Sequence, residues 1–310
     1  MRQEDCAMLK EGFVHSDSIK LHYIDWGGAG RPLVLLAGLG GTAQHYRGLA
    51  PKLTDRFRVV GLTRRGHGRS DRPDSGYDID TFVEDIHCFL DALGIEQAIL
   101  VGHSFAGVEM PFFATRYPHC VEAIVYLDAL FPKLDSAPDF SDDPVWSVLR
   151  IGPTATDLAS REAYLAYYKR ARPDWANIWC EAIEADLMEY ATTKEDGQIE
   201  DHHDDALMNR ILMAARTWPL EYAKVAAPML AIVPAGNFHP SVPLDAMDEL
   251  RRAADQYWEE KFLPWIRQRT ATFRQAVPTA RIVELDSSHH YIFIAKEDET
   301  VKAINDFLPS

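Results

Sequence analysis

The apolar positions of this chain fall into short runs that alternate with amphipathic stretches through its first 130 residues. Residues 19–26 alternate apolar and polar positions, as a half-buried strand does, and four later runs are apolar almost throughout. These four runs are residues 32–37, 57–62, 97–102 and 121–127. Between them, residues 79–93 and 108–117 carry apolar side chains at helical spacing. Strands that alternate with helices of this length predict crossover connections, a mainly parallel sheet and therefore an α/β fold.

The pattern changes in the middle of the chain. Residues from about 133 to 224 predict several helices, interrupted by Pro and Asp, and contain no convincing strand run. Strand-like runs return at residues 228–233 and 280–285, and an amphipathic helix follows at 296–308. A helical block inserted into a parallel sheet is typical of a lid over a catalytic face rather than of a second independent domain.

We therefore expect a sheet core made of residues 1–132 and 226–310, with a helical lid made of residues 133–225. The 310 residues, 47% of them hydrophobic, are enough for a large core. With 32 basic and 47 acidic residues the net charge is −15, a sign that repels phosphate. This predicts a small-molecule partner, with no nucleic acid and no membrane as partners. The lid segment carries 10 basic and 18 acidic residues, so much of the acidity describes its surface.

The cysteines and the start of the chain bear on its location. The four cysteines lie far apart and lack metal-type spacing, as expected of thiols in a reducing compartment. The first residues include acidic side chains and no apolar run of the length that a signal peptide needs. We expect a cytoplasmic protein.

A serine occupies the connection between a predicted strand and a predicted helix. The run LVGHSFAG, residues 100–107, contains Ser104 in the strand–turn–helix context of a nucleophile elbow. Residues two before and two after such a serine must be small so that the chain can pass, and Gly102 and Ala106 are small. The sequence predicts that Ser104 is a nucleophile, and an ordinary strand-end turn is the alternative.

A serine hydroxyl needs a histidine to accept its proton and a carboxylate to orient that histidine. After the last predicted strand comes DSSHHY, residues 286–291, so His289 or His290 is the candidate base. Two loop histidines without function are the alternative.

The acid is less obvious from the sequence. The loop after the strand at residues 228–233 contains Asn237 but no carboxylate nearby. Asp128 directly follows the strand at residues 121–127, at the edge of a parallel sheet where catalytic groups collect. We favour Asp128 as the orienting acid. The alternatives are Asp245, Asp286 and a structural role for Asp128.

Two backbone groups are candidates for an oxyanion hole. One donor is expected from the residue after the serine, Phe105, and the other from the loop after the first long apolar run, where Leu39 follows Gly38. Ala37 stands where a histidine often supports this loop. The glycines of this loop match neither common nucleotide-binding spacing, so we expect no nucleotide.

Three further segments are interpreted as structural. The arginine-rich turn at residues 63–78 is taken as a loop beside the site, with contact to an acidic substrate as the alternative. The run EDHHDD, residues 200–205, has metal-ligand residue types at adjacent positions, and we interpret it as a solvated loop. The aromatic residues of the lid are taken as cores of small helices, and the alternative is that some of them roof a pocket. We expect no metal and no cofactor.

Taken together, these motifs resemble those of the serine-dependent α/β hydrolases that bear a lid. They are LLAGLGGTA, GLTRRGHGRSDRPDSGYD, VGHSFAGVEM, YPHCVEAIVYLDALFP and SSHHYIFI. More narrowly, the chain is similar to a bacterial subgroup with TRRGxGxS, GHSxAGxE, YLDA and a His-Tyr pair. The resemblance implies an α/β-hydrolase fold with a mainly parallel eight-stranded sheet, flanked by helices, and a lid inserted after the sixth strand.

The resemblance also implies a catalytic triad of Ser104, His290 and Asp128, with Leu39 and Phe105 as the oxyanion donors. We expect a carboxylesterase-like serine hydrolase, monomeric or homodimeric, that acts on a small, partly hydrophobic ester. Amidase, carbon–carbon hydrolase or acyltransferase activity with the same triad is the alternative. A non-catalytic ligand-binding protein of the same fold is a further one.

Overall fold

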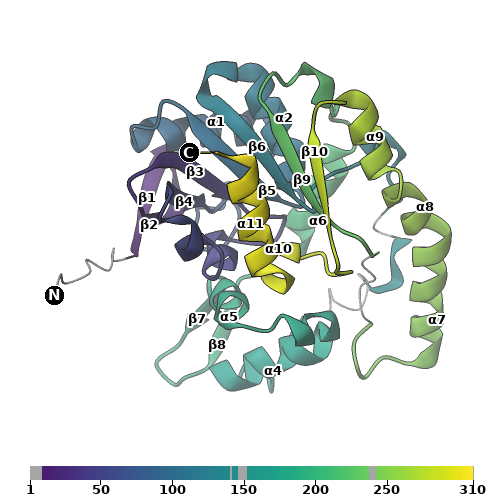
Figure 1. Ribbon diagram of the computed structural model, residues 1–310. Helices are drawn as coiled ribbons and strands as arrows, with labels where there is room; N and C mark the ends of the chain where they lie inside the picture. The colour runs from purple at the N-terminus through teal and green to yellow at the C-terminus, as the bar shows by residue number, and fades with distance from the viewer. Residues whose placement is uncertain (1–8, 140–141, 146–151, 237–241, 310) are drawn as a thin grey trace.

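An eight-stranded sheet runs through the middle of the molecule (Figure 1). The structure, a computed structural model, describes residues 9–139, 142–145, 152–236 and 242–309. The strand order is β1-β2-β4-β3-β5-β6-β9-β10, in which β2 pairs antiparallel with β1 and β4, and the other neighbours are parallel. The strands are β1 Lys10–Ser16, β2 Ile19–Gly27, β3 Arg31–Leu36, β4 Phe57–Leu62, β5 Ala98–His103, β6 Val121–Leu127, β9 Met229–Pro234 and β10 Arg281–Leu285. The predicted α/β class and mainly parallel eight-stranded sheet are confirmed.

Helices cover both faces of the sheet. The α-helices of the described residues are α1 Ile79–Ala92, α2 Ala106–Arg116, α4 Arg161–Ala171, α5 Glu181–Met188, α6 Asp205–Ala215, α7 Asp248–Tyr257, α8 Leu263–Ile266, α9 Arg269–Ala276, α10 Ile292–Ala295 and α11 Glu297–Phe307, of which α1, α2, α9, α10 and α11 pack on the sheet faces. Helix α1 shows why the predicted bounds of this helix, residues 79–93, were close to the observed ones. Asp78 caps α1 by accepting a hydrogen bond from the Thr81 N–H at 2.9 Å, and Gly94, with φ of 64°, follows its end.

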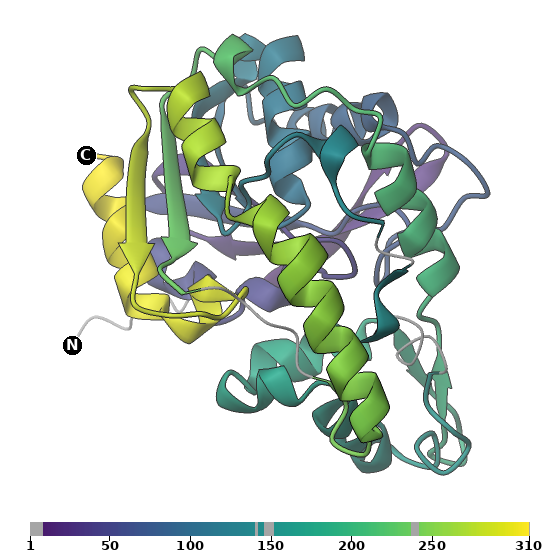
Figure 2. The same ribbon diagram turned by 90° about the vertical axis from the view of Figure 1, so that its right-hand side faces the viewer.

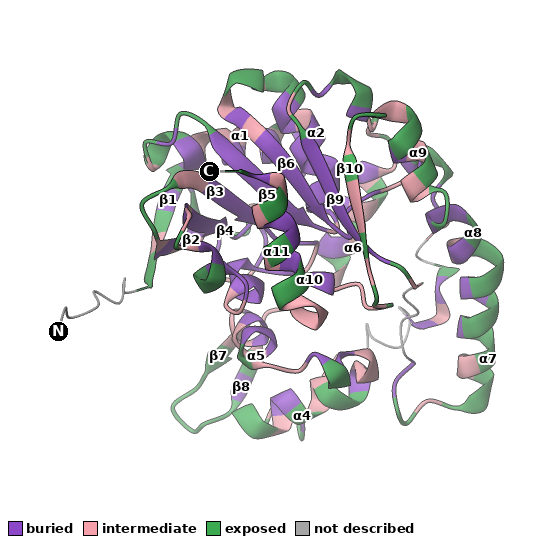
Figure 3. Ribbon diagram, in the orientation of Figure 1, coloured by how far each residue is buried: buried purple, intermediate pink, exposed green. Residues whose placement is uncertain are grey.

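The side chains of the central strands alternate between two hydrophobic layers. In β3, Val34 and Leu36 belong to the cluster with α1, α2 and α9, whereas Leu33 and Leu35 belong to the cluster with α10 and α11. The central strands are buried over most of their length, as Figure 3 shows, because helices cover both of their faces. The residues of the site lie at the ends of these packed strands.

The segment between β6 and β9 lies beyond the carboxyl ends of the parallel strands (Figures 1 and 2). It contains α4, α5 and α6, and also a short antiparallel hairpin of β7 Ala191–Thr193 and β8 Ile199–Asp201. The expectation of no strand in this segment is therefore wrong for these two strands. That residues 133–225 act as a lid remains a prediction, and below we call this segment the cap.

A second helical stretch also reaches the same end of the sheet. Between β9 and β10 the chain forms α7, a π-helical turn at Trp258–Phe262, then α8 and α9 (Figure 2). The described residues include no helix that is both long and apolar enough to cross a membrane.

Candidate active site

Ser104 sits on a strained turn between β5 and α2. Its φ is 49°, a left-handed conformation that residues other than glycine rarely adopt, at a cost on the order of 1–3 kcal/mol. The turn is tight as well: a Cβ on Gly102 would lie 2.6 Å from Met110 Cε and 2.8 Å from Ala106 Cβ. The small residues that the sequence pattern required therefore have a steric reason.

Asp128 occupies the matching position on the neighbouring strand. His103 of β5 pairs with Leu127 of β6, so the residue after each strand end, Ser104 and Asp128, is placed at the same edge. Asp128 also has a positive φ, 45°, and its N–H donates to the carbonyl of Ile232 on β9 at 2.8 Å. Its side chain is buried.

The structure brings His290 to Asp128. His290 Nδ1 lies 2.7 Å from Asp128 Oδ2, close enough for a hydrogen bond that fixes the imidazole. His289 is engaged elsewhere, with Nε2 at 2.9 Å from the Asp174 carbonyl and Nδ1 accepting from the Tyr291 N–H at 3.0 Å.

The other candidate acids differ from Asp128 in their setting. Asp245 and Asp286 are exposed, and Asn237 lies outside the described residues. A carboxylate in water is screened and free to turn, so neither exposed aspartate has the fixed contact that Asp128 makes with an imidazole.

One cavity of about 540 Å³ gathers the predicted groups. Ser104, Asp128 and His290 line it, as do Leu39 and Phe105. Phe105 precedes the first turn of α2, where backbone N–H groups have no partner within the helix. The volume suits a small organic molecule.

His103 lies against His290, the predicted base. Its Nε2 lies 3.1 Å from the His290 carbonyl oxygen, and the two ring centroids are 4.5 Å apart. Burial, and secondarily the nearby His290, holds the pKa of His103 well below its ordinary value. A neutral His103 donates one hydrogen bond to the backbone of His290 without adding charge beside it.

The loop that carries Leu39 is held from the sheet side by Arg64. Its guanidinium donates to the carbonyls of Ala37 at 2.9 Å and Gly38 at 3.3 Å, and pairs with both oxygens of Glu109, at 2.6 Å for Oε2. Both members of the pair are buried. The side chain of Ala37 is too small to support the loop, and Arg64 supplies that support instead. The turn at residues 63–78 is therefore structural, as interpreted.

The cap holds the same loop from the opposite side. Asp186 of α5 accepts hydrogen bonds from Thr42 N and Thr42 Oγ1, both at 2.7 Å, and its second oxygen lies 3.2 Å from His45 Nε2. Burial raises the pKa of Asp186 to about 7 and lowers that of His45 to about 3. The oxyanion loop therefore contacts the core on one side and the cap on the other.

Sequence reasoning missed Arg269 and the aromatic wall beside it. Arg269 Nη2 lies 3.1 Å from Asp128 Oδ1, so the oxygen that does not meet His290 is held by a guanidinium. Trp258, Phe262 and Trp265 line the cavity from the stretch between β9 and β10. The regularly spaced aromatics of that stretch were a usable signal, but their spacing alone does not tell a core face from a cavity face.

The cap segments also depart in part from expectation. Tyr164 and Trp175 belong to a buried cap core, as interpreted, yet Trp175, Tyr167 and Tyr168 line the cavity as well. The interpretation of residues 200–205 as a solvated loop is wrong for four of them, because Asp201, His203, Asp204 and Asp205 line the cavity. They lie at the end of β8 and the start of α6, and the sequence did not indicate that this segment reaches the cavity.

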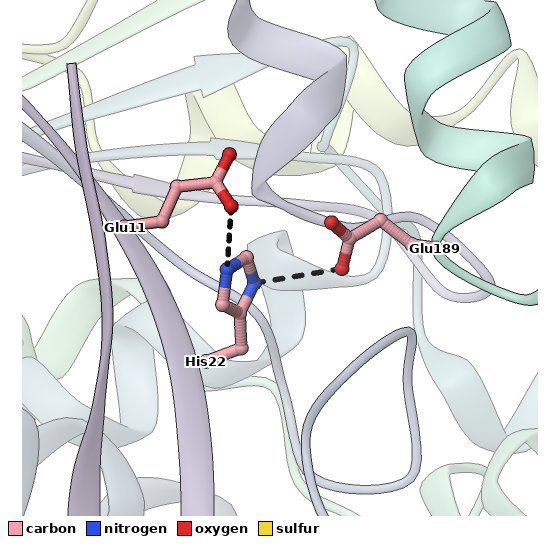
Figure 4. A group of neighbouring side chains, drawn as sticks. All are labelled: Glu11, His22 and Glu189. Atoms are coloured by element: carbon pink, nitrogen blue, oxygen red, sulfur yellow. Dashed lines mark ion pairs between the residues drawn. The ribbon is translucent and has the colours of Figure 1, made fainter.

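One group of described residues has the spacing of a metal site. Glu11, His22 and Glu189 offer ligand atoms within 4.8 Å of one another (Figure 4). Arg69, however, donates to Glu11 Oε2 at 2.6 Å and lies 3.4 Å from His22 Nε2, so a cation on that nitrogen would meet the guanidinium. We assign no metal to this group, whose contacts are those of a polar network that joins β1 and β2 to the end of α5.

A strained serine at a strand–helix turn, an Asp–His contact and a mainly parallel eight-stranded sheet define an α/β-hydrolase fold. The family model described as alpha/beta hydrolase fold matches residues 31–158, and the solved structures found agree with it. The chain therefore has the α/β-hydrolase fold, and residues 31–158 match the model of that family. The matched range contains Ser104 and Asp128 and ends before His290.

Individual relatives match over shorter stretches. A non-heme chloroperoxidase of Streptomyces lividans is 35% identical over 130 residues, and a bifunctional esterase/perhydrolase of Acinetobacter calcoaceticus is 34% identical over 133 residues. Each match covers 40% of this chain and 47% of the relative, so it spans about half the length of these curated relatives. The solved structure of E-2-(acetamidomethylene)succinate hydrolase is similar with a TM-score of 0.74 and 22% identity, over 96% of this chain and 98% of that one.

Proposed function

We propose that this protein is a serine hydrolase that cleaves carboxylic esters of small, partly hydrophobic molecules through an acyl-enzyme. The observation that carries the proposal is the 2.7 Å contact of His290 Nδ1 with the buried Asp128, in the same cavity as Ser104. One of the relatives is named an esterase/perhydrolase, which supports ester cleavage.

In this mechanism Ser104 Oγ attacks the ester carbonyl carbon while His290 Nε2 takes its proton. Asp128 accepts from His290 Nδ1–H and stabilises the imidazolium that forms. The N–H groups of Leu39 and Phe105 donate to the oxyanion of the tetrahedral intermediate. When the carbon–oxygen bond breaks, His290 returns the proton to the leaving alkoxide, and the acyl group stays on Ser104.

Water then completes the cycle. His290 takes a proton from water, the resulting hydroxide adds to the acyl carbonyl, and the acid leaves as Ser104 regains its proton. The same sequence of steps cleaves an amide if the leaving amine is protonated by His290. The apolar wall of Trp258, Phe262 and Trp265 supports a partly hydrophobic substrate.

Labelling with a fluorophosphonate tests this proposal directly. We expect the native protein to react stoichiometrically and to hydrolyse p-nitrophenyl esters, and Ser104→Ala to do neither. Ser287→Ala, another serine near the predicted base, is the matched control and should label normally. A native protein that folds but does not react contradicts the proposal. Comparing p-nitrophenyl hexanoate with the matching anilide then separates esterase from amidase activity.

A further inference from the structure

The run EDHHDD places one histidine outside the cavity and its neighbour on the cavity wall. His202 Nε2 contacts the Thr192 hydroxyl at 2.8 Å across the β7–β8 hairpin, whereas His203 lines the cavity that contains Ser104. The backbone holds this arrangement, because the His202 N–H donates to the Tyr190 carbonyl at 2.7 Å. Two adjacent histidines therefore face different surroundings.

The imidazole of His203 is fixed by contacts on its Nδ1 edge and on its face. Nδ1 lies 2.6 Å from Asp201 Oδ1 and 3.1 Å from the Tyr168 hydroxyl. Tyr190 stacks on the ring, with centroids 4.1 Å apart and planes 19° apart. Asp201 is held in turn by the Tyr164 hydroxyl at 3.0 Å.

These contacts decide the hydrogen-bonding role of the other ring nitrogen. An ionised carboxylate has no proton to give, so the proton of the neutral ring must lie on Nδ1, and Nε2 carries the lone pair. The Tyr164 hydroxyl and His203 Nδ1 both contact Asp201 Oδ1, as hydrogen-bond donors to an ionised carboxylate do. Within the part of the chain that the structure describes, Nε2 has no hydrogen-bond partner.

The charges around His203 select against an anionic ligand. Asp201, Asp204 and Asp205 line the cavity on this side, and the guanidinium of Arg172 is paired with Asp174 at 3.1 Å. Arg216, another cationic lining residue, follows the far end of α6, roughly 16 Å from its start at about 1.5 Å per residue. A carboxylate beside His203 would be repelled, whereas a hydroxyl or ammonium group would not.

We propose that His203, oriented by Asp201, is a second polar binding subsite on the cap wall of the cavity, which accepts a hydrogen bond from a hydroxyl or amine group of the substrate. The group that it binds is remote from the ester bond that Ser104 attacks. The inference rests on the proposed hydrolase function and names its substrate class: esters whose acyl or alcohol part carries a neutral or cationic hydrogen-bond donor.

Four acyl esters test the subsite. They are the p-nitrophenyl esters of hexanoic, 6-hydroxyhexanoic and 6-aminohexanoic acids, and the p-nitrophenyl monoester of adipic acid. We expect the native protein to prefer the hydroxy and amino esters over the adipate ester. We expect His203→Phe to lower kcat/KM for the hydroxy ester about tenfold, the effect of one lost hydrogen bond, mainly through KM. The loss on the hexanoate ester, which carries no hydrogen-bond donor at that end, should be smaller than the loss on the hydroxy ester.

Two further variants separate recognition from folding. His203→Gln keeps a hydrogen-bonding side chain and should retain part of the preference, and His202→Phe changes the neighbouring histidine and should leave all four esters unaffected. Equal losses on the hexanoate and hydroxy esters, an unchanged preference in His203→Phe, or a native preference for the adipate ester would each overturn the proposal. Fluorophosphonate labelling of Ser104 is measured on every variant, so that failure of the hydrolase function itself is seen separately.

Discussion

Two of the His–Asp pairs that line the cavity have nearly the same short separation, and their surroundings are what differ. His290 meets Asp128 at 2.7 Å, and His203 meets Asp201 at 2.6 Å. The first pair stands at the carboxyl edge of the sheet, beside a strained serine and two candidate oxyanion donors. The second stands in the cap among tyrosine hydroxyls and aspartates.

This comparison shows that a His–Asp contact alone does not define a catalytic centre. The imidazole becomes a base in catalysis only where a nucleophile and a preorganised site for the developing charge lie within its reach. In the cap, the same pair has a fixed orientation but no nucleophile in its described contacts, so we assign it to binding. The predictions below test this division.

The largest effect is expected at the sheet-edge pair. Asp128→Asn keeps the shape of the side chain but removes its charge and favours the wrong tautomer of His290, so we expect kcat on p-nitrophenyl hexanoate to fall about 10³–10⁴-fold. Asp286→Asn, the same change at an exposed position, should stay within about twofold. In Asp201→Asn, kcat on p-nitrophenyl hexanoate should change less than about threefold. The loss in this variant should be confined to the p-nitrophenyl ester of 6-hydroxyhexanoic acid. Equal losses in Asp128→Asn and Asp201→Asn would contradict the division between the two pairs.

The next effect concerns the oxyanion loop, which lines the same cavity as the sheet-edge pair. Glu109→Gln leaves Arg64 buried without its counter-charge, which costs on the order of 3–5 kcal/mol of unfolding free energy and frees the loop carbonyls. We expect kcat to fall about 10–100-fold in protein that is still folded, with little change in KM.

A second buried pair gives the matched control for that experiment. Arg65 and Asp85 are joined by two hydrogen bonds, at 2.6 Å for the Nη2–Oδ1 bond, and are as buried as Arg64 and Glu109. Their contacts do not include the oxyanion loop. Asp85→Asn should therefore lower the thermal midpoint comparably and leave kcat of the folded protein almost unchanged. If both variants lose kcat equally, the loop contact has no specific role.

The smallest effect on catalysis is expected at Asp186, where the cap meets the oxyanion loop and the effect is on the pH dependence of stability. Burial raises the pKa of Asp186 from its ordinary value of 3.8 to about 7, so the folded protein binds this proton more tightly than the unfolded chain does. The stabilisation is fully present below about pH 4 and is lost as the pH rises toward 7, by up to roughly 4 kcal/mol. The other ionisable side chains that interact with Asp186 are His45, Glu189, Tyr190, His203 and Tyr291.

Asp186→Asn isolates this contribution, because the amide oxygen can still accept from Thr42 and cannot ionise. The free energy of unfolding by urea, measured at pH 5 and at pH 8, should fall less between these values in the variant than in the native protein. Asp286→Asn serves as the control and should keep the native difference. An identical pH dependence in native protein and Asp186→Asn would show that Asp186 is ionised throughout.

The strands of the core followed closely from the chain pattern, and the exceptions have a physical reason. The strands that form β4 and β6 were predicted at their observed bounds, because both faces of a central strand are buried and its apolar run is continuous. β1 was not predicted, since this edge strand buries only Val14 and Ser16. β7 and β8 are three residues each and mostly polar, so they carry no hydrophobic pattern.

For the candidate site, the strand–turn–helix context indicated Ser104, and the end of a strand indicated Asp128. The residue pattern alone did not distinguish His289 from His290 as the base. The structure adds the contact between His290 and Asp128, the engagement of His289 by backbone groups, and Arg269 on the far oxygen of Asp128. Apart from the hydrogen bond between His289 and the Tyr291 N–H, these contacts join residues far apart in the sequence, and His290 lies 162 residues after Asp128.

The sequence by itself determined the alternation of strands and helices and the residues that follow the strand ends, because periodicity and turn chemistry act between near neighbours. It also determined the excess of acidic residues in the cap. Only the tertiary structure decided which of those residues share the cavity, that Arg64 supports the oxyanion loop, and that His203 faces inward while His202 does not. Burial, desolvation and contact between distant segments arise only when the chain packs, and they assign the two His–Asp pairs their different surroundings.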